Sequence, residues 1–190
     1  DLNDGSRGAC NDWMEARLCG GARFNSSVYA DSNVVKFASL QPLSGGDAEW
    51  ETTSTMGVFC ALEAIHADDA ILPGITLEPV FGDTQGSQNG GFTSALCVTQ
   101  QAGARFLLGP SYSGAAFGAA VVGKIYDIAL LGTTASNPEL SSRDHTTGFP
   151  TFNRVFPSDT YQGAALATVV AHFGWSKIAI VTISNDASTL

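Results

Sequence analysis

Apolar and polar positions follow two alternating patterns from residue 34 onwards. Short apolar runs between turn residues are typical of buried strands, whereas apolar residues spaced three and four apart predict amphipathic helices. The strands predicted in this way span residues 34–40, 75–81, 105–108, 128–131, 152–156 and 178–183. The helices are expected at residues 49–67, 92–102 and 114–126 and after residue 158, and a single helical turn is expected within the loop at residues 133–143.

Residues 152–186 show this alternation most completely. Ser158 follows a short strand and is a residue type that caps helix N-termini, and Gly174 stands where a helix end needs a positive φ. The apolar positions between them share one helix face: Ala165, Leu166, Val169, Val170 and Phe173. We predict that this face and Trp175 pack into a core, which makes the segment a strand–helix–strand unit.

Strands that alternate with helices favour an α/β fold, a doubly wound parallel sheet with helices on both faces. Ligands of such sheets bind beyond the carboxyl ends of the strands, where the strand order reverses. Two loops leave adjacent carboxyl ends, at residues 110–114 and 133–138, and both are rich in hydroxyl groups and small residues. These loops are therefore the candidate binding site.

Composition and charge narrow the classes of partner. The chain has 190 residues, of which 44% are apolar, enough for one sizeable core or one large lobe. Its net charge is −9, and residues 38–103 contain no Lys or Arg. Such a surface repels phosphate groups, so neither nucleic acid nor an anionic membrane is expected as a partner. No apolar run reaches the roughly 20 residues of a membrane-spanning helix.

The cysteines and one sequon point to the secretory pathway. The four cysteines are Cys10, Cys19, Cys60 and Cys97. None lies in a CxxC motif or at metal-ligand spacing from a histidine, so zinc is not expected, and the even number fits two disulfides. Asn25 begins an Asn-Ser-Ser glycosylation sequon. Together these features favour an extracellular or cell-surface protein.

Five segments occur in an order and at spacings that suggest a family. They are ASLQPLSGG, FCALEAIHADDAILPGITLEPVFGDT, LLGPSYSGAA, LLGTTASNPELSSR and FPTFNRVFPSDTYQG. In these segments the chain resembles the first lobe of the type I periplasmic-binding-protein-like domain. That domain is the two-lobed ligand-binding region of metabotropic glutamate, GABA-B and natriuretic-peptide receptors. His66 departs from the pattern, since Asn is usual there.

The resemblance implies a domain organisation. Residues 34–176 would form lobe one, and residues 177–190 the first strand of a truncated lobe two. The polar, Gly-rich residues 1–33 would be an N-terminal extension with two cysteines. In this topology strand 75–81 lies at the sheet edge, beside strand 34–40. Lobe one would then pack against the rest of the parent chain, which would include lobe two and a transmembrane region.

The resemblance also implies a function: an extracellular receptor or sensor that binds a small molecule between its lobes, with amino acids as the first candidate class. A serine matching Ser113 holds the ligand carboxylate in amino-acid-binding members, and hydroxyls matching Thr134 and Ser136 hold the amino group. Tyr112 and Gly114 complete the turn, where a helix N-terminus favours an anion.

Two alternatives remain open for this loop region and for the whole chain. The serines and glycines could simply cap a helix and form a turn. The chain could also be an extracellular structural or assembly module that uses the same fold without a ligand. Such a module would form a homodimer or part of a larger assembly.

We do not expect an enzyme. Residues 109–113 nearly match a G-x-S-x-G nucleophile elbow, but Ser113 stands where the second glycine is needed, and His172 is expected on a solvent-facing side of its helix. No cofactor-binding motif is present. His66, near two aspartates, is better explained by a solvated helix C-terminus than by a metal site.

The disulfide pairing stays open between two schemes. Right-handed crossovers should place the helices that carry Cys60 and Cys97 on opposite faces of the sheet. We therefore favour cross-pairing, in which Cys10 and Cys19 attach the N-terminal extension to both helices. The alternative pairs Cys10 with Cys19 and joins Cys60 to Cys97 around the sheet edge.

Overall fold

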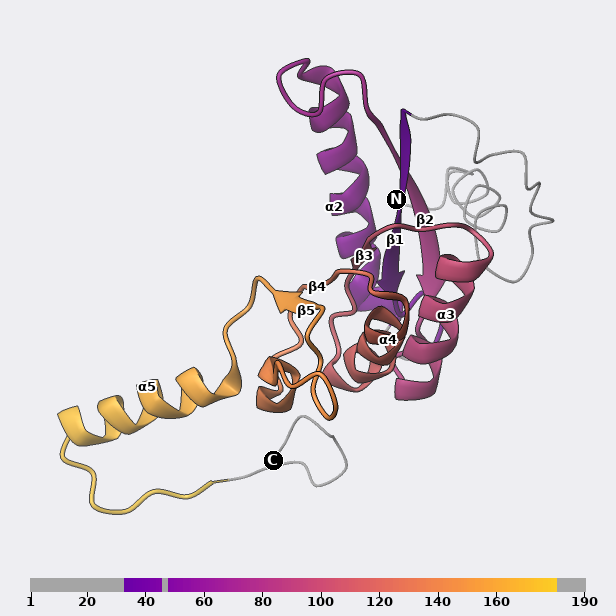
Figure 1. Ribbon diagram of the computed structural model, residues 1–190. Helices are drawn as coiled ribbons and strands as arrows, with labels where there is room; N and C mark the ends of the chain where they lie inside the picture. Colours follow the sequence, from indigo (N-terminus) through magenta and orange to yellow (C-terminus); the bar gives the residue numbers. More distant parts are fainter. Residues whose placement is uncertain (1–32, 46–47, 181–190) are drawn as a thin grey trace.

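The computed structural model describes residues 33–45 and 48–180 and shows one parallel sheet (Figure 1). Its strands are β1 (Val34–Gln41), β2 (Thr76–Asp83), β3 (Leu107–Leu108), β4 (Leu130–Gly132) and β5 (Phe152–Arg154). Their order is β2-β1-β3-β4-β5, and every pair of neighbours is parallel. The predicted α/β class is confirmed, as is the place of β2 at the edge beside β1.

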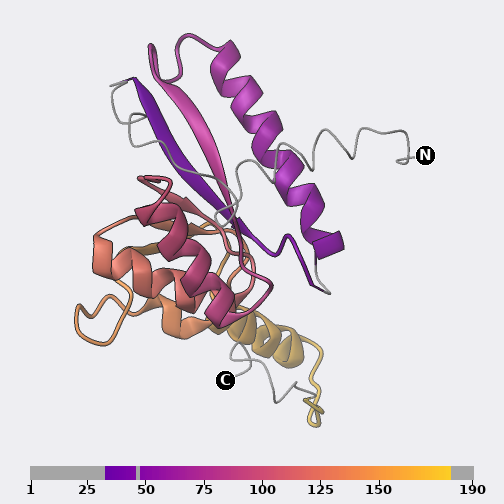
Figure 2. The same cartoon turned by 90° about the vertical axis from the view of Figure 1, so that its right-hand side faces the viewer.

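Helices cover both faces of the sheet. α2 (Ala48–Ala67) lies on one face, and α3 (Gln88–Gln100) and α4 (Ser113–Tyr126) lie on the other (Figure 2). A 3-10 turn, η2 (Pro138–Ser141), follows β4, and α5 (Asp159–His172) follows β5. The helices that carry Cys60 and Cys97 therefore lie on opposite faces, as the crossover rule predicts.

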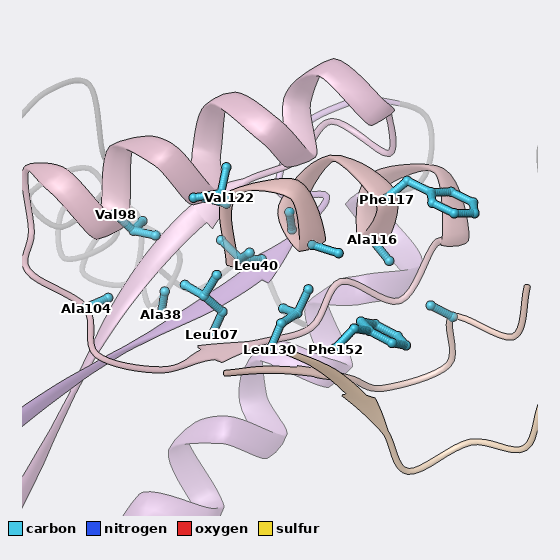
Figure 3. Packing of buried hydrophobic residues seen from close by; sticks show 14 of the residues in the cluster. Ala38, Leu40, Val98, Ala104, Leu107, Ala116, Phe117, Val122, Leu130 and Phe152 are labelled. Carbon is cyan, nitrogen blue, oxygen red and sulfur yellow. The ribbon is translucent and has the colours of Figure 1, made fainter. Parts of the chain in front are cut away.

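The largest hydrophobic core fills the space between the sheet and α3 and α4. Figure 3 shows Leu40, Leu107 and Leu130 pointing from neighbouring strands toward these two helices. All three leucines are fully buried, and Val98 and Val122 meet them from the helices. This core fixes the sheet and thereby the position of its carboxyl edge.

Several predicted boundaries differ from the structure for local reasons. α3 begins at Gln88, four residues before the predicted start, because Ser87 Oγ accepts a hydrogen bond from Gly90 N at 3.0 Å and caps the helix. The apolar spacing of α2 predicts that both Met56 and Leu62 face the core, but only Leu62 is buried and Met56 is 51% exposed. The face that meets the sheet instead carries Thr55 and Val58.

The prediction that α5 packs into a core is wrong. Ser158 stands at its N-cap, and Gly174 has the expected positive φ of 64°, but every residue of α5 is exposed or half-buried. Leu166 is 66% exposed and Trp175, stacked on the Phe173 ring, is 55% exposed. α5 extends away from the sheet (Figure 1), so no described element covers its apolar residues.

Other predictions fall wholly or partly outside the described residues. Residues 178–180 do not form the predicted strand, and residues 181–183 lie outside the described part.

Cys60 is a free, exposed thiol, which contradicts both pairing schemes at this position because α2 presents it to solvent. Cys97 is disulfide-bonded. The N-terminal extension with Cys10, Cys19 and Asn25 lies outside the described residues.

Candidate ligand site at the carboxyl edge of the sheet

The first candidate loop leaves the carboxyl end of β3. It turns at Gly109, whose φ is 89° and whose added Cβ would lie 2.3 Å from the Leu40 carbonyl oxygen. Only glycine fits so close an approach with a positive φ. The chain then passes Ser111 and Tyr112 and enters α4 at Ser113.

Two hydrogen bonds join this turn to the second candidate loop, which follows β4. Thr134 Oγ1 donates to the Ser111 carbonyl oxygen at 3.0 Å. Ser113 Oγ accepts from Asn137 N at 3.2 Å. The structure therefore brings the two predicted loops side by side.

The five predicted residues differ in their accessibility. Thr134 is exposed, whereas Tyr112, Gly114 and Ser136 are half-buried. Ser113 is only 6% exposed, and its hydroxyl supports the neighbouring loop. Ser136 Oγ donates to Asp159 Oδ2 at 3.0 Å, while Asp159 N donates to the Ser136 carbonyl oxygen at 3.0 Å. The first residue of α5 is thus joined to this loop.

Two further polar features of this turn bear on ligand binding. Ser111 Oγ is buried and has no hydrogen-bond partner. The side chain of Tyr112, the N-cap residue of α4, forms no capping hydrogen bond. The first N–H groups of a helix lack partners within the helix and, with the helix dipole, favour an anion. The turn therefore offers a hydroxyl and backbone donors at one place.

Arg154, at the end of β5, contacts the second candidate loop, which the sequence pattern did not predict. Its guanidinium donates to the carbonyl oxygens of Ala135 at 3.0 Å and Asn137 at 2.9 Å, and also to Ser141 Oγ. Partial burial lowers the pKa of Arg154; nearby Asp159 opposes this shift and Arg143 adds to it. Arg154 holds the second loop in shape. A lone arginine at a strand end gives no sequence signal for such a long-range role.

Asp83, at the carboxyl end of β2, was also missed. Its carboxylate accepts hydrogen bonds from Leu43 N at 2.9 Å, from Ser44 N at 3.3 Å and from Ser44 Oγ at 2.5 Å. It also accepts one from Gln85 N at 2.9 Å within its own turn. A third loop, between β1 and α2, is thereby attached to the end of β2 at this edge.

His66 and His172 both lie near the exposed C-terminal ends of their helices. His66 is exposed in the last turn of α2, where its Nε2 accepts a hydrogen bond from Leu77 N at 3.1 Å. His172 is exposed in α5. Within residues 33–45 and 48–180, no group of three His, Cys, Asp or Glu side chains is arranged to hold a metal ion.

A family model described as the receptor family ligand binding region matches residues 54–189. The chain belongs to this family. The receptor family ligand-binding region is of the receptor and binding-protein type rather than an enzyme family. In the portion of this chain that the structure describes, no helix combines the length and apolar composition needed to cross a membrane.

Similar proteins include plant and animal receptors. Glutamate receptor 3.1 of Oryza sativa subsp. japonica is 28% identical over 73% of this chain, and this chain covers 15% of that protein. Gamma-aminobutyric acid type B receptor subunit 1 of Rattus norvegicus is 23% identical over 97% of the chain, which covers 19% of that protein. The chain therefore spans less than a fifth of either receptor.

Solved structures show the same fold. An ABC transporter substrate-binding protein from Desulfitobacterium hafniense has a TM-score of 0.67 and 20% identity over 82% of this chain and 44% of its own. A leucine binding protein from Thermotoga maritima has a TM-score of 0.60 and 22% identity over 74% of this chain and 38% of its own. These likenesses confirm the periplasmic-binding-protein-like fold.

Proposed function

We propose that the chain is lobe one, over residues 34–176, of an extracellular receptor or sensor that binds a small amino-acid-like molecule against a second lobe. One observation carries this proposal: the loops after β3 and β4, joined through Ser111 and Thr134, lie side by side at the carboxyl edge of a sheet in a receptor ligand-binding family. Relatives named for glutamate, for gamma-aminobutyric acid and for leucine support the amino-acid class.

The chemistry of the edge fits the two ends of an amino acid. The N-terminus of α4 and the Ser111 hydroxyl favour a carboxylate. The hydroxyls of Thr134 and Ser136 can accept hydrogen bonds from an ammonium group while donating to their present partners. In this proposal Ser113 does not contact the ligand. Its hydroxyl accepts the hydrogen bond from Asn137 N and so holds the second loop in position, while Tyr112 and Gly114 shape the turn.

Saturation-transfer difference NMR with the chain and a panel of free amino acids, including γ-aminobutyrate, tests the proposal. A single lobe supplies only part of the contacts, so we expect dissociation constants on the order of 1 mM, about −4 kcal/mol. Thr134→Val should weaken the signal at least threefold, because it removes an exposed hydroxyl of the site.

Thr168→Val is the matched control, because Thr168 Oγ1 is also exposed and also donates to a carbonyl oxygen at 3.0 Å, but in α5. This variant should bind as the unmodified chain does. Absence of saturation transfer to every amino acid, or equal losses in the two variants, would contradict the proposal.

The exposed apolar side chains of α5 favour a second candidate, an assembly module. Tyr161, Leu166 and Phe173 are all more than half exposed. Apolar area of this kind can bind another protein surface. Light scattering separates the candidates: Leu166→Ser should reduce self-association if α5 is an assembly surface and leave amino-acid binding unchanged.

A further inference from the structure

Asp83 stands at the carboxyl end of the edge strand β2 and collects donors from two loops. Its Oδ1 accepts hydrogen bonds from Leu43 N at 2.9 Å, from Ser44 N at 3.3 Å and from Gln85 N at 2.9 Å. Its Oδ2 accepts from Ser44 Oγ at 2.5 Å. Leu43 and Ser44 precede Asp83 in the sequence by 40 and 39 residues respectively.

A carboxylate is suited to this place because all four partners are donors. An ionised acceptor forms shorter and stronger hydrogen bonds than a neutral one. Asp83 is half-buried and Ser44 is exposed, so these bonds lie at the solvent-facing edge of the sheet. One side chain thus adds four hydrogen bonds at the start of this surface loop and in the neighbouring turn.

A series of contacts leads from Asp83 to the candidate ligand site. Thr84 N, the next residue, donates to the Gln41 carbonyl oxygen at 2.9 Å. The Gln41 side chain is almost fully buried, and its Nε2 lies 3.3 Å from the position that a Cβ on Gly109 would take. Gly109 begins the turn that carries Ser111, which receives the hydrogen bond from Thr134.

We propose that Asp83 is a positioning residue for the ligand site. It fixes the start of the β1–α2 loop, Leu43 and Ser44, beside the loops that follow β3 and β4, so that three loops rather than two border a bound ligand. The role in binding rests on the proposed function, whereas the role in fixing the loop does not.

Amide hydrogen exchange measures the fixing of the loop without any ligand. In D83A, exchange at Leu43 N and Ser44 N should be at least tenfold faster, because both N–H groups lose their acceptor. In D83N the remaining carbonyl oxygen can still accept from both, and Ser44 Oγ can accept from the new amide group, so exchange should stay within about threefold.

Asp144→Ala is the matched control. Asp144 is an exposed carboxylate that accepts three hydrogen bonds, from Thr146 N, Thr147 N and Thr147 Oγ1. It lies near Lys124, in the last turn of α4, and so toward the opposite edge of the sheet. D144A should leave exchange at Leu43 and Ser44 unchanged. Should D83A not fold, S44A, which removes only the contact to Oδ2, should still quicken exchange at the Leu43 N–H measurably.

Amino-acid affinity is the second readout. D83A should raise the dissociation constant at least tenfold, while D83N and D144A should change it by less than threefold. Unchanged exchange at Leu43 and Ser44 in D83A overturns the proposal, and so does faster exchange with unchanged affinity. If the unmodified chain binds no amino acid while D83A still frees the loop, the proposed function fails and Asp83 remains supported as the anchor of the loop.

Discussion

Gly118 and Gly91 set how closely α3 and α4 approach each other. A Cβ on Gly118 would lie 2.1 Å from the Gln88 carbonyl oxygen and 2.6 Å from Phe92 N. A Cβ on Gly91 would lie 2.1 Å from the Ala115 carbonyl oxygen. At these residues the two helices meet backbone to backbone, which brings the N-terminus of α4 to its place at the ligand edge.

Gly118→Ala should therefore destabilise the protein, although alanine favours helices. We expect the free energy of unfolding to fall by about 1–3 kcal/mol, the usual cost of overpacking. Gly163→Ala in α5 is the matched control, since no atom lies within 4 Å of its added Cβ; there the free energy of unfolding should rise by about 0.5–1 kcal/mol. Urea denaturation measures both, and equal effects would contradict this account of α3–α4 packing.

Asp144 gives the loop between β4 and β5 a pH dependence. Hydrogen bonds from Thr147 N and then Thr146 N lower the pKa of the Asp144 carboxyl below its ordinary value of 3.8. Because the folded state holds the charged form, Asp144 contributes stability above the unfolded pKa, and this contribution is lost as the pH falls through the lower folded pKa.

Asp144→Asn should consequently unfold at a lower urea concentration than the unmodified chain at pH 7, and the two midpoints should converge as the pH falls below about 3.9. A difference in midpoint that stays constant down to pH 2, or that grows on acidification, would show that the charge on Asp144 is not what stabilises this turn.

Between residues 34 and 172, periodicity predicted which segments are helices and strands but not what each helix contacts. α5 has the apolar spacing of a packed helix, yet its apolar side chains are exposed or half-buried because α5 leaves the sheet. α3 begins four residues before its predicted start, and the glycines in this added part, Gly90 and Gly91, allow close packing. The spacing of apolar residues along a chain does not show which elements a helix will pack against in the folded protein.

Two leucine substitutions test this contrast between buried and exposed elements. Leu140 in η2 is fully buried, so Leu140→Ala should lower the free energy of unfolding by about 2–5 kcal/mol through lost contacts and a cavity. Leu166 in α5 is 66% exposed, so Leu166→Ala should change it by less than about 0.5 kcal/mol. A comparable loss for both variants, measured by urea denaturation, would mean that α5 is packed in solution.

At the scale of the whole molecule, the rule that ligands bind at the carboxyl edge of a parallel sheet placed the two candidate loops correctly beside each other. The sequence could not show how they are held. Ser111 and Thr134 are 23 residues apart, and Arg154 reaches back 17 residues to Asn137. Nor could it show that Ser113 is buried against Asn137 N. Contacts between distant residues depend on the assembled sheet.

The most direct test of ligand binding at this edge is a ¹⁵N–¹H correlation spectrum of the chain, recorded while an amino acid that gives saturation transfer is added. The largest shift changes should fall on residues 111–114 and 134–137, with smaller ones on Leu43 and Ser44 and none on the exposed face of α5. Shift changes confined to α5, or no change up to 20 times the dissociation constant expected, about 20 mM, would contradict ligand binding at this edge.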